Sequence, residues 1–256
     1  MLEIILFTHV GLGDFILNIP IINYLLKNIA STIDIICYQH NVKHIKYFFK
    51  NNNRIKLIPF KNFKELISFF PDNINYFENK LIMRSGMHAK KSNTRTFPFF
   101  FYDDLNINRN VMKTHATIRN TTKTLEIYEY ILNVDYIFIS NETSQGEIFD
   151  INNKLFECGI DKNNILVICS NKNIYDPNNK FYNIADKFVY KSNNLLILDY
   201  KLILENANLI ILSDSSLFCF AILLNLKSYK NIVVVRTNNI DWNSLMFYSN
   251  NKFIIK

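Results

Sequence analysis

Glycine, proline and charge are scarce in this sequence, and each shortage excludes a class of protein. The 256 residues include five Gly and five Pro, which is too few for a collagen-like, linker-like or Pro/Gly-rich disordered chain. Charged residues make up 20% and hydrophobic residues 49%, so general disorder is not expected either. The sequence predicts a folded chain with a substantial core, of a size that fits one large domain or two small ones.

Blocks of like charge are absent as well. Lys and Arg number 29 against 22 Asp and Glu, which gives a formal net charge of +7, but the basic residues are scattered along the chain. Positive charge favours an anionic partner such as a nucleotide diphosphate, a membrane surface or nucleic acid. Because no run of five or six like charges occurs, a solvated basic surface is the simpler interpretation, and we expect no nucleic-acid partner.

Metal-ligand patterns and membrane signals are also missing. The four Cys lie far apart without a CxxC pair, and the five His show no zinc-ligand spacing with them. We therefore expect reduced thiols, no metal and a cytoplasmic location. Met1–Phe7 lacks a basic n-region and is typical of a buried strand, not of a signal peptide. In the apolar stretch 209–226, Asp214 argues against a membrane-spanning helix.

Apolar strands alternate with helical patterns in the first half of the chain. Pro20 falls inside the first helical pattern and indicates a kink or a late helix start. Residues 85–110 are aromatic and polar by turns and receive no assignment. The expected strands are 3–8, 33–38, 54–58 (closed by Pro59) and 80–84, and the expected helices are 15–26, 42–49 and 63–70.

The same alternation returns in the second half after a helix at 121–133, which Thr121 or Thr122 would cap. Its apolar face is expected to consist of Leu125, Tyr128, Ile131 and Leu132. Residues 253–255 would form a short strand or part of a tail that returns to the first domain. The expected strands are 134–140, 165–169, 195–198, 209–212 and 232–235, and the expected helices are 180–189, 200–206 and 215–224.

Strands that alternate with short helices indicate parallel sheets with helices on both faces. We therefore predict an α/β fold of two Rossmann-like parallel-sheet halves, residues 1–125 and 126–256. Open sheets of this kind bind ligands at the carboxyl ends of their strands. A cleft that the two halves face is the expected site.

The first candidate site follows the first strand. Gly11 and Gly13 allow close approach of the backbone to a ligand, and His9 directly precedes this turn. Asp14 lies where the first helix begins, so it is either a helix-capping residue or a general base. The turn is no dinucleotide fingerprint, because Ile16 stands where a third glycine would be needed.

Two further candidate segments follow apolar strands of the second half. One is Ser213-Asp214-Ser215-Ser216, and the other is Ser170-Asn171-Lys172. Small polar residues at a strand–helix junction cap the helix or present hydroxyl and N–H groups to a phosphate. Lys172 is either a surface lysine or a point charge that reaches a diphosphate. In the first half, Arg84 and His88 follow an expected strand and would face an acceptor.

In their order and spacing, these segments resemble the heptosyltransferase-like, glycosyltransferase family 9-like group of GT-B fold enzymes. That group opens with a strand, a G-x-G-D turn and a helix, here Gly11-Leu12-Gly13-Asp14. Its second half carries a D-[ST]-G-x-x-H-x-A-like motif after a strand, matched here by the run from Asp214 to Ala221. A lysine-bearing phosphate loop of the group corresponds to the loop of Lys172.

The resemblance implies a hexosyl- or heptosyltransferase that acts on a nucleotide-diphosphate sugar and a glycan or glycolipid acceptor, without a cofactor or metal. It implies that Asp14 is the base, that Ser170–Lys172 and Ser213–Ser216 hold the donor, and that the transfer inverts the anomeric centre. His9, Gly11, Gly13, Arg84 and His88 would belong to the acceptor side. The basic surface is compatible with peripheral contact to a membrane.

The sequence departs from the family motif at two positions, because Ser216 replaces its Gly and Cys219 replaces its His. These departures leave open an inactive GT-B-like protein that binds a nucleotide or a glycan. A nucleic-acid binder is a second alternative and would need its basic residues on one face. A reductase would need the third glycine that is missing here, and a methyltransferase would need a G-x-G-x-G run.

Overall fold

A computed structural model describes residues 1–8, 11–71, 73–86, 97–143, 146–235 and 241–256. The chain forms two compact units. Unit 1 comprises Met1–Ile118 and Asn239–Ser249, and unit 2 comprises Arg119–Asn238 and Asn250–Lys256. The first division lies before the expected boundary at 125. The segment that returns to unit 1 is 239–249, whereas residues 254–255 form a strand of unit 2.

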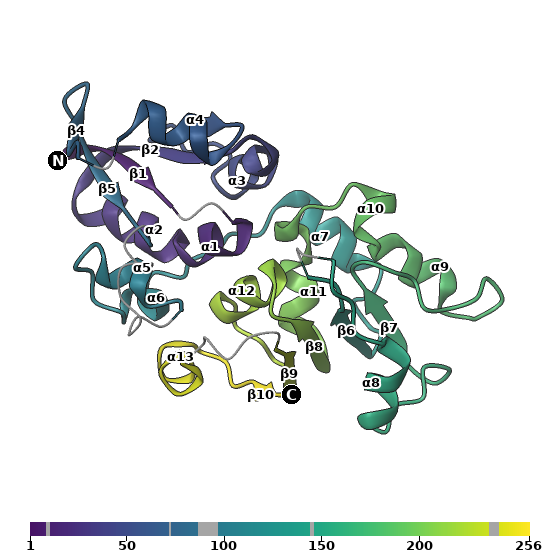
Figure 1. Ribbon diagram of the computed structural model, residues 1–256. Helices are drawn as coiled ribbons and strands as arrows, with labels where there is room; N and C mark the ends of the chain where they lie inside the picture. The colour runs from purple at the N-terminus through teal and green to yellow at the C-terminus, as the bar shows by residue number, and fades with distance from the viewer. Residues whose placement is uncertain (9–10, 72, 87–96, 144–145, 236–240) are drawn as a thin grey trace. The chain divides into compact units, whose positions relative to one another are not determined.

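Unit 1 contains a five-stranded sheet in the order β3-β2-β1-β5-β4, in which only β4 runs antiparallel to its neighbour. Helices α1 and α2 lie on one side of the sheet and α4 on the other (Figure 1). The strands are β1 (Leu2–Phe7), β2 (Ala30–Tyr38), β3 (Ile55–Phe60), β4 (Tyr76–Phe77) and β5 (Lys80–Arg84). The helices are α1 (Leu12–Leu17), α2 (Ile19–Asn28), η1 (Gln39–Asn41), α3 (Val42–Phe48), α4 (Phe63–Phe69), α5 (Phe100–Asp103), α6 (Val111–Thr114) and α13 (Trp242–Tyr248).

Successive side chains of the central strand β1 point to opposite faces of this sheet, and both faces carry a hydrophobic core. Ile5 and Phe7 of β1 pack with Phe70 and other apolar side chains on the α4 side. Ile4 and Leu6 point to the opposite face and are fully buried. Since both faces are covered, the strand is a continuous apolar run, which is why it is recognisable in the sequence.

Two expected features of unit 1 differ in the structure. Pro59 does not end β3 but lies within it, opposite Cys37 of β2. This is tolerated because β3 is an edge strand, where the missing N–H of proline removes no ladder hydrogen bond. The unassigned aromatic segment supplies core residues, since Phe99, Phe101 and Tyr102 are all buried.

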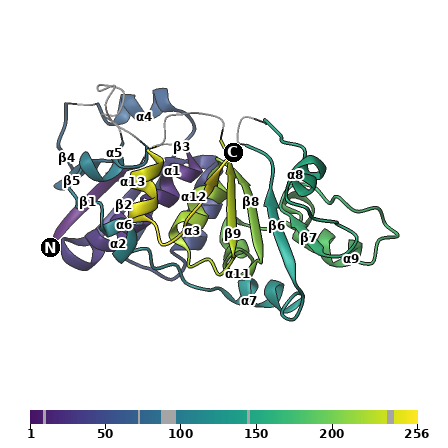
Figure 2. The same cartoon turned by 90° about the horizontal axis from the view of Figure 1, so that it is seen from below.

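Unit 2 contains a five-stranded parallel sheet in the order β10-β9-β8-β6-β7, whose strands lie side by side in Figure 2. The strands are β6 (Tyr136–Ser140), β7 (Leu166–Cys169), β8 (Leu209–Ser213), β9 (Lys230–Val234) and β10 (Ile254–Ile255). The helices are α7 (Thr122–Glu129), α8 (Ile151–Glu157), α9 (Tyr182–Ala185), η3 (Asp186–Phe188), α10 (Tyr190–Asn193), η4 (Ile197–Tyr200), α11 (Lys201–Asn206) and α12 (Ser216–Leu223). Every residue of β6, β7 and β8 is buried. The predicted fold of two α/β parallel-sheet halves is confirmed.

The strand expected at 195–198 is wrong, because this segment enters the short helix η4. The carboxylate of Asp199 accepts a hydrogen bond from the backbone N–H of Leu196 at 2.7 Å and closes a turn there. The ring of Tyr200 then packs against Phe138 of β6 at 5.6 Å between centroids. A run of four apolar residues is compatible with a buried strand or a buried turn. The turn forms here because the Asp199 carboxylate caps it.

The face expected for α7 is only partly correct. Ile131 is buried as expected, but Leu125 and Leu132 are exposed, and Thr124 and Ile127 are buried instead. The helix ends at Glu129, four residues before the expected end at 133. Thr124 is tolerated in the interior because its backbone N–H and hydroxyl both bond to the side chain of the capping residue Thr121.

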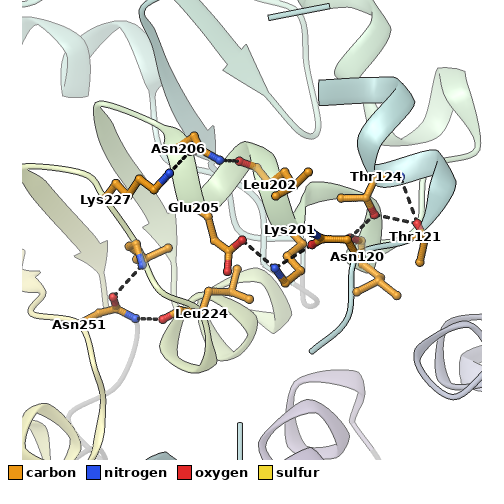
Figure 3. Close-up of polar contacts among 12 residues, drawn as sticks. Asn120, Thr121, Thr124, Lys201, Leu202, Glu205, Asn206, Leu224, Lys227 and Asn251 are labelled. Atoms are coloured by element: carbon orange, nitrogen blue, oxygen red, sulfur yellow. Dashed lines mark hydrogen bonds and ion pairs between the residues drawn. The ribbon is translucent and has the colours of Figure 1, made fainter. Parts of the chain in front are cut away.

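A chain of polar contacts fixes the start of unit 2 (Figure 3). The buried ammonium group of Lys201 donates to the side-chain carbonyl of Asn120 at 2.9 Å and to the carboxylate of Glu205 at 2.7 Å. These contacts compensate the lysine for the loss of water. Further along, the side chain of Asn251 bonds to the chain that follows α12. Buried polar contacts therefore anchor the chain close to both points where it enters unit 2, Arg119 and Asn250.

Candidate functional site

Each sheet has a topological switch point, where the chain leaves a central strand on one side and later returns on its other side. In unit 1 the chain runs from β1 to β2 and β3, and β5 then pairs with the opposite edge of β1. In unit 2 it runs from β6 to β7, and β8 then pairs with the opposite edge of β6. Ligands of open α/β sheets bind outside the carboxyl ends of the strands at such points.

The switch point of unit 1 carries Asp14. Helix α1 begins directly after Gly11, which takes an extended conformation, and Asp14 lies in the first turn, half-buried. A Cβ atom built on Gly11 would lie 2.6 Å from Oδ2 of Asp14. The carboxylate thus folds back over Gly11, and a side chain at that position would displace it. Gly13 lies within α1, while His9 lies outside the described residues.

Arg84, at the end of β5, is almost fully buried. Its Nη2 donates to the backbone carbonyls of Pro71 at 3.0 Å and Ile74 at 2.8 Å. The guanidinium lies 5.3 Å from the ring centroid of Phe7, a cation–π distance. These contacts hold the segment that follows α4 against the sheet. The other acceptor-side candidate of this segment, His88, lies outside the described residues.

The carboxyl ends of β7, β6 and β8 lie side by side in the sheet of unit 2 and bring the two donor segments to one edge. Ser170 follows β7, and its Oγ is buried and has no hydrogen-bond partner among the residues that the structure describes. Asn171 is half-buried and Lys172 is exposed. A buried hydroxyl without a partner is costly, and a ligand oxygen here would satisfy it.

Cys169 organises the backbone of this loop. Burial raises the pKa of its thiol, and the backbone amides of Asn171 and Lys172, which point at the sulfur, partly oppose that rise. Its Sγ also lies 3.8 Å from Oδ1 of Asn141, the residue that follows β6. Asn141 therefore lies between the two donor segments. The sequence places it after a strand, but this signal alone does not distinguish a ligand-binding residue from a turn.

The segment after β8 is half-buried and leads into α12. The hydroxyl of Ser213 donates to the backbone carbonyl of Ser140 at 3.0 Å, so it joins β8 to β6 across the switch point. Ser215 is the N-cap residue of α12, yet its side chain makes no capping hydrogen bond. Asp214 and Ser216 flank it and are half-buried. The amino end of α12, with its positive partial charge, thus lies at the same sheet edge as Ser170.

The described residues show neither the ligand cluster of a metal centre nor a helix that could span a membrane. Among them, no three His, Cys, Asp or Glu side chains gather closely enough to hold a metal ion. No helix within the described ranges has the length and apolar character that crossing a membrane requires. All four cysteines are free thiols.

No family model matches the sequence, and no curated protein matches it. Solved structures do match. The glycosyl transferase family 9 protein from Veillonella parvula DSM 2008 aligns with a TM-score of 0.56 and 12% identity, over 99% of this chain and 85% of that one. The E. coli ADP-heptose lps heptosyltransferase II aligns with a TM-score of 0.55 and 10% identity, over 100% of this chain and 90% of that one. The chain therefore has the GT-B-like fold of these heptosyltransferase-type structures, as the sequence motifs predict.

Proposed function

We propose that this protein is a glycosyltransferase that moves a sugar from a nucleotide-diphosphate sugar to a hydroxyl group of a glycan or glycolipid. One observation carries the proposal. In a fold shared with glycosyltransferases, the residues that match the family motifs follow strands at the switch points of both sheets or, for the Lys172 loop, the strand next to one. One of the matched structures is named as an ADP-heptose heptosyltransferase, so an ADP-linked heptose is the first donor to test.

Unit 2 would bind the donor. The ammonium group of Lys172 and the amino end of α12 supply positive charge for the diphosphate. The Ser170 hydroxyl has no partner among the described residues, and the Ser215 hydroxyl does not cap α12, so both can donate hydrogen bonds to the diphosphate oxygens. Such groups stabilise the charge that develops on the leaving diphosphate and so favour cleavage of the sugar–phosphate bond.

Asp14 of unit 1 would act as the general base. Its carboxylate accepts the proton of the acceptor hydroxyl as that oxygen attacks the anomeric carbon of the sugar. The bond from this carbon to the diphosphate oxygen breaks, and the nucleoside diphosphate leaves with the electron pair. A single displacement inverts the anomeric centre. We further propose that no metal is required and that the protein acts in the cytoplasm, which its free thiols support.

The test combines donor binding with donor turnover. We expect one class of nucleoside diphosphate to raise the melting temperature of the wild type, since a ligand at 100 times its Kd stabilises by about 2.7 kcal/mol. Lys172→Ala should abolish this shift. Lys162→Ala is the matched control, because Lys162 precedes β7 and so lies at the other end of that strand. A shift that Lys172→Ala leaves intact contradicts the donor site.

Turnover is measured as release of nucleoside diphosphate from the sugar nucleotide that binds, with and without EDTA. Asp14→Asn should retain binding and lower release to a small residual rate. Loss of release upon EDTA treatment alone would refute metal independence.

Binding without turnover in the wild type would favour the alternative, an inactive nucleotide- or glycan-binding protein. One observation motivates it. Cys219, which replaces the histidine of the family motif, is a buried thiol within α12. A buried thiol carries no positive charge with which to stabilise a leaving diphosphate.

A further inference from the structure

The helix that carries Asp14 is broken at Asn18, and a buried polar network fills the break. Pro20 lies in the first turn of α2 and has no N–H, so it cannot continue the hydrogen bonds of α1. The side chain of Asn18 occupies the interruption, and its Nδ2 donates to the backbone carbonyl of Asp14 at 2.8 Å. Tyr102 donates its hydroxyl to the carbonyl of Leu17 at 3.0 Å. Side chains thus bond to two carbonyls of α1, and the Asp14 carbonyl also accepts from the backbone N–H of Asn18 at 3.2 Å.

The other end of the Asn18 amide reaches β5. Its Oδ1 accepts a hydrogen bond from the hydroxyl of Ser85 at 2.5 Å. Ser85 follows β5, and its backbone N–H donates to the carbonyl of Phe7 at the end of β1 at 2.8 Å. Asn18 therefore links the turn of Asp14 to the ends of both strands that form the switch point.

The backbone beyond Ser85 is shaped to keep this hydroxyl buried. Gly86 has a φ of +79°, and a Cβ atom there would lie 2.6 Å from the ring of Phe101. The absence of a side chain lets that ring pack directly over the chain. The backbone carbonyl of Phe101 lies 3.2 Å from the Ser85 hydroxyl. Ser85 and Asn18 have no exposed surface, so water does not compete for their hydrogen bonds.

A buried amide is costly unless its polar atoms are bonded, and here the partner of each is fixed by the sheet or by α1. Any rotation of the first turn of α1 would break one of these bonds. We propose that Asn18 and Ser85 are positioning residues that hold Asp14 in place for proton transfer. This inference rests on the proposed function, in which Asp14 is the base. An error of 1 Å in placing a reacting group lowers a rate by up to about 100-fold.

The experiment is a double-mutant cycle in the full-length protein with Ser85→Ala and Asp14→Asn, with ADP-heptose as the first donor. Ser85→Ala should lower kcat by about tenfold and leave the KM for the donor unchanged. In the Asp14→Asn background it should lower the residual rate no further, because the residue acts only through Asp14. Thr124→Val is the control, since it removes a buried hydroxyl in unit 2; it should leave kcat unchanged.

Hydrogen exchange of the α1 amides gives a readout that needs no substrate. Ser85→Ala should speed exchange over Phe15–Asn18 by at least about tenfold, whereas Thr124→Val should not. Unchanged exchange and unchanged kcat in Ser85→Ala would overturn the inference, as would an equal loss of rate with and without Asp14. If the wild type neither binds nor turns over any nucleotide sugar, the proposed function itself fails.

Discussion

Replacement of Asn251 by alanine should destabilise unit 2 strongly, although Asn251 lies five residues from the last residue of the sequence. The side chain is buried and makes hydrogen bonds to the chain at the end of α12; Figure 3 shows the one to Leu224. Its Nδ2 donates to the carbonyls of Leu224 at 2.8 Å and Ala221 at 2.9 Å. Its Oδ1 accepts from the N–H of Leu226 at 3.1 Å.

The magnitude follows from the groups that would be left without a partner. The carbonyl of Ala221 keeps the N–H of Leu224 at 3.2 Å, but the Leu224 carbonyl and the Leu226 N–H lose the bonds that Asn251 provides. Each unsatisfied buried group costs about 1–3 kcal/mol. Water that enters the space of the truncated side chain recovers part of this. We expect a loss of about 3 kcal/mol, which lowers the melting temperature by on the order of 10 °C.

Thermal unfolding followed by circular dichroism measures this loss. Asn250→Ala is the control, because that neighbouring side chain is exposed and its hydrogen bond to Asn225 is long, at 3.4 Å. It should change the melting temperature by less than about 2 °C, as is usual for a surface substitution. If the two variants melt at the same temperature, the reasoning from buried hydrogen bonds is refuted.

Three further predictions concern other parts of the chain. Burial raises the pKa of the Cys37 thiol to about 11, whereas Cys158 is half-buried; Cys158→Ser should remove the fastest reaction with a disulfide reagent at pH 8, and Cys37→Ser should not. Hydrogen bonds from Ser244 lower the pKa of the Asp241 carboxyl, the N-cap of α13. The ionised Asp241 carboxylate therefore stabilises the fold at neutral pH, and this stabilisation is lost as the pH falls below the ordinary pKa of 3.8. Melting curves at decreasing pH should show less acid destabilisation for Asp241→Asn than for the wild type. Tyr102→Phe should cost about 1–2 kcal/mol in urea unfolding, because a buried carbonyl loses its donor; an unchanged midpoint would argue against that bond.

The parallel strands are the part of the fold that the sequence predicts best. A strand covered on both faces, such as β8, is a continuous apolar run, and polar residues mark its carboxyl end. The helices are predicted less well, because burial of a helix face depends on partners far away in the sequence. Thr124 replaces Leu125 in the interior because a capping threonine satisfies its polar groups.

In the candidate site too, the sequence predicts features at strand ends but not contacts between residues that are far apart in the chain. The positions of Asp14 and Lys172 after strands can be predicted, since strand ends are visible in the sequence. The hydrogen bond that joins Ser85 to Asn18 spans 67 residues and depends on strand order. Neither residue belongs to a motif, so only the three-dimensional arrangement identifies them.

The discontinuous composition of the units constrains how this protein can be dissected. The chain passes from one unit to the other three times, after Ile118, after Asn238 and after Ser249. A fragment that ends at Ile118 retains the whole first sheet but lacks α13, whose Tyr248 ring lies 5.4 Å from that of Phe99. A truncation before residue 239 removes α13 from one unit and β10 from the other. Unit 1 therefore cannot be expressed intact as one uninterrupted fragment, and a circular permutant or a co-expressed peptide that carries α13 is needed to study it alone. The fragment 119–256 contains all of unit 2, but it also carries α13 without the rest of unit 1.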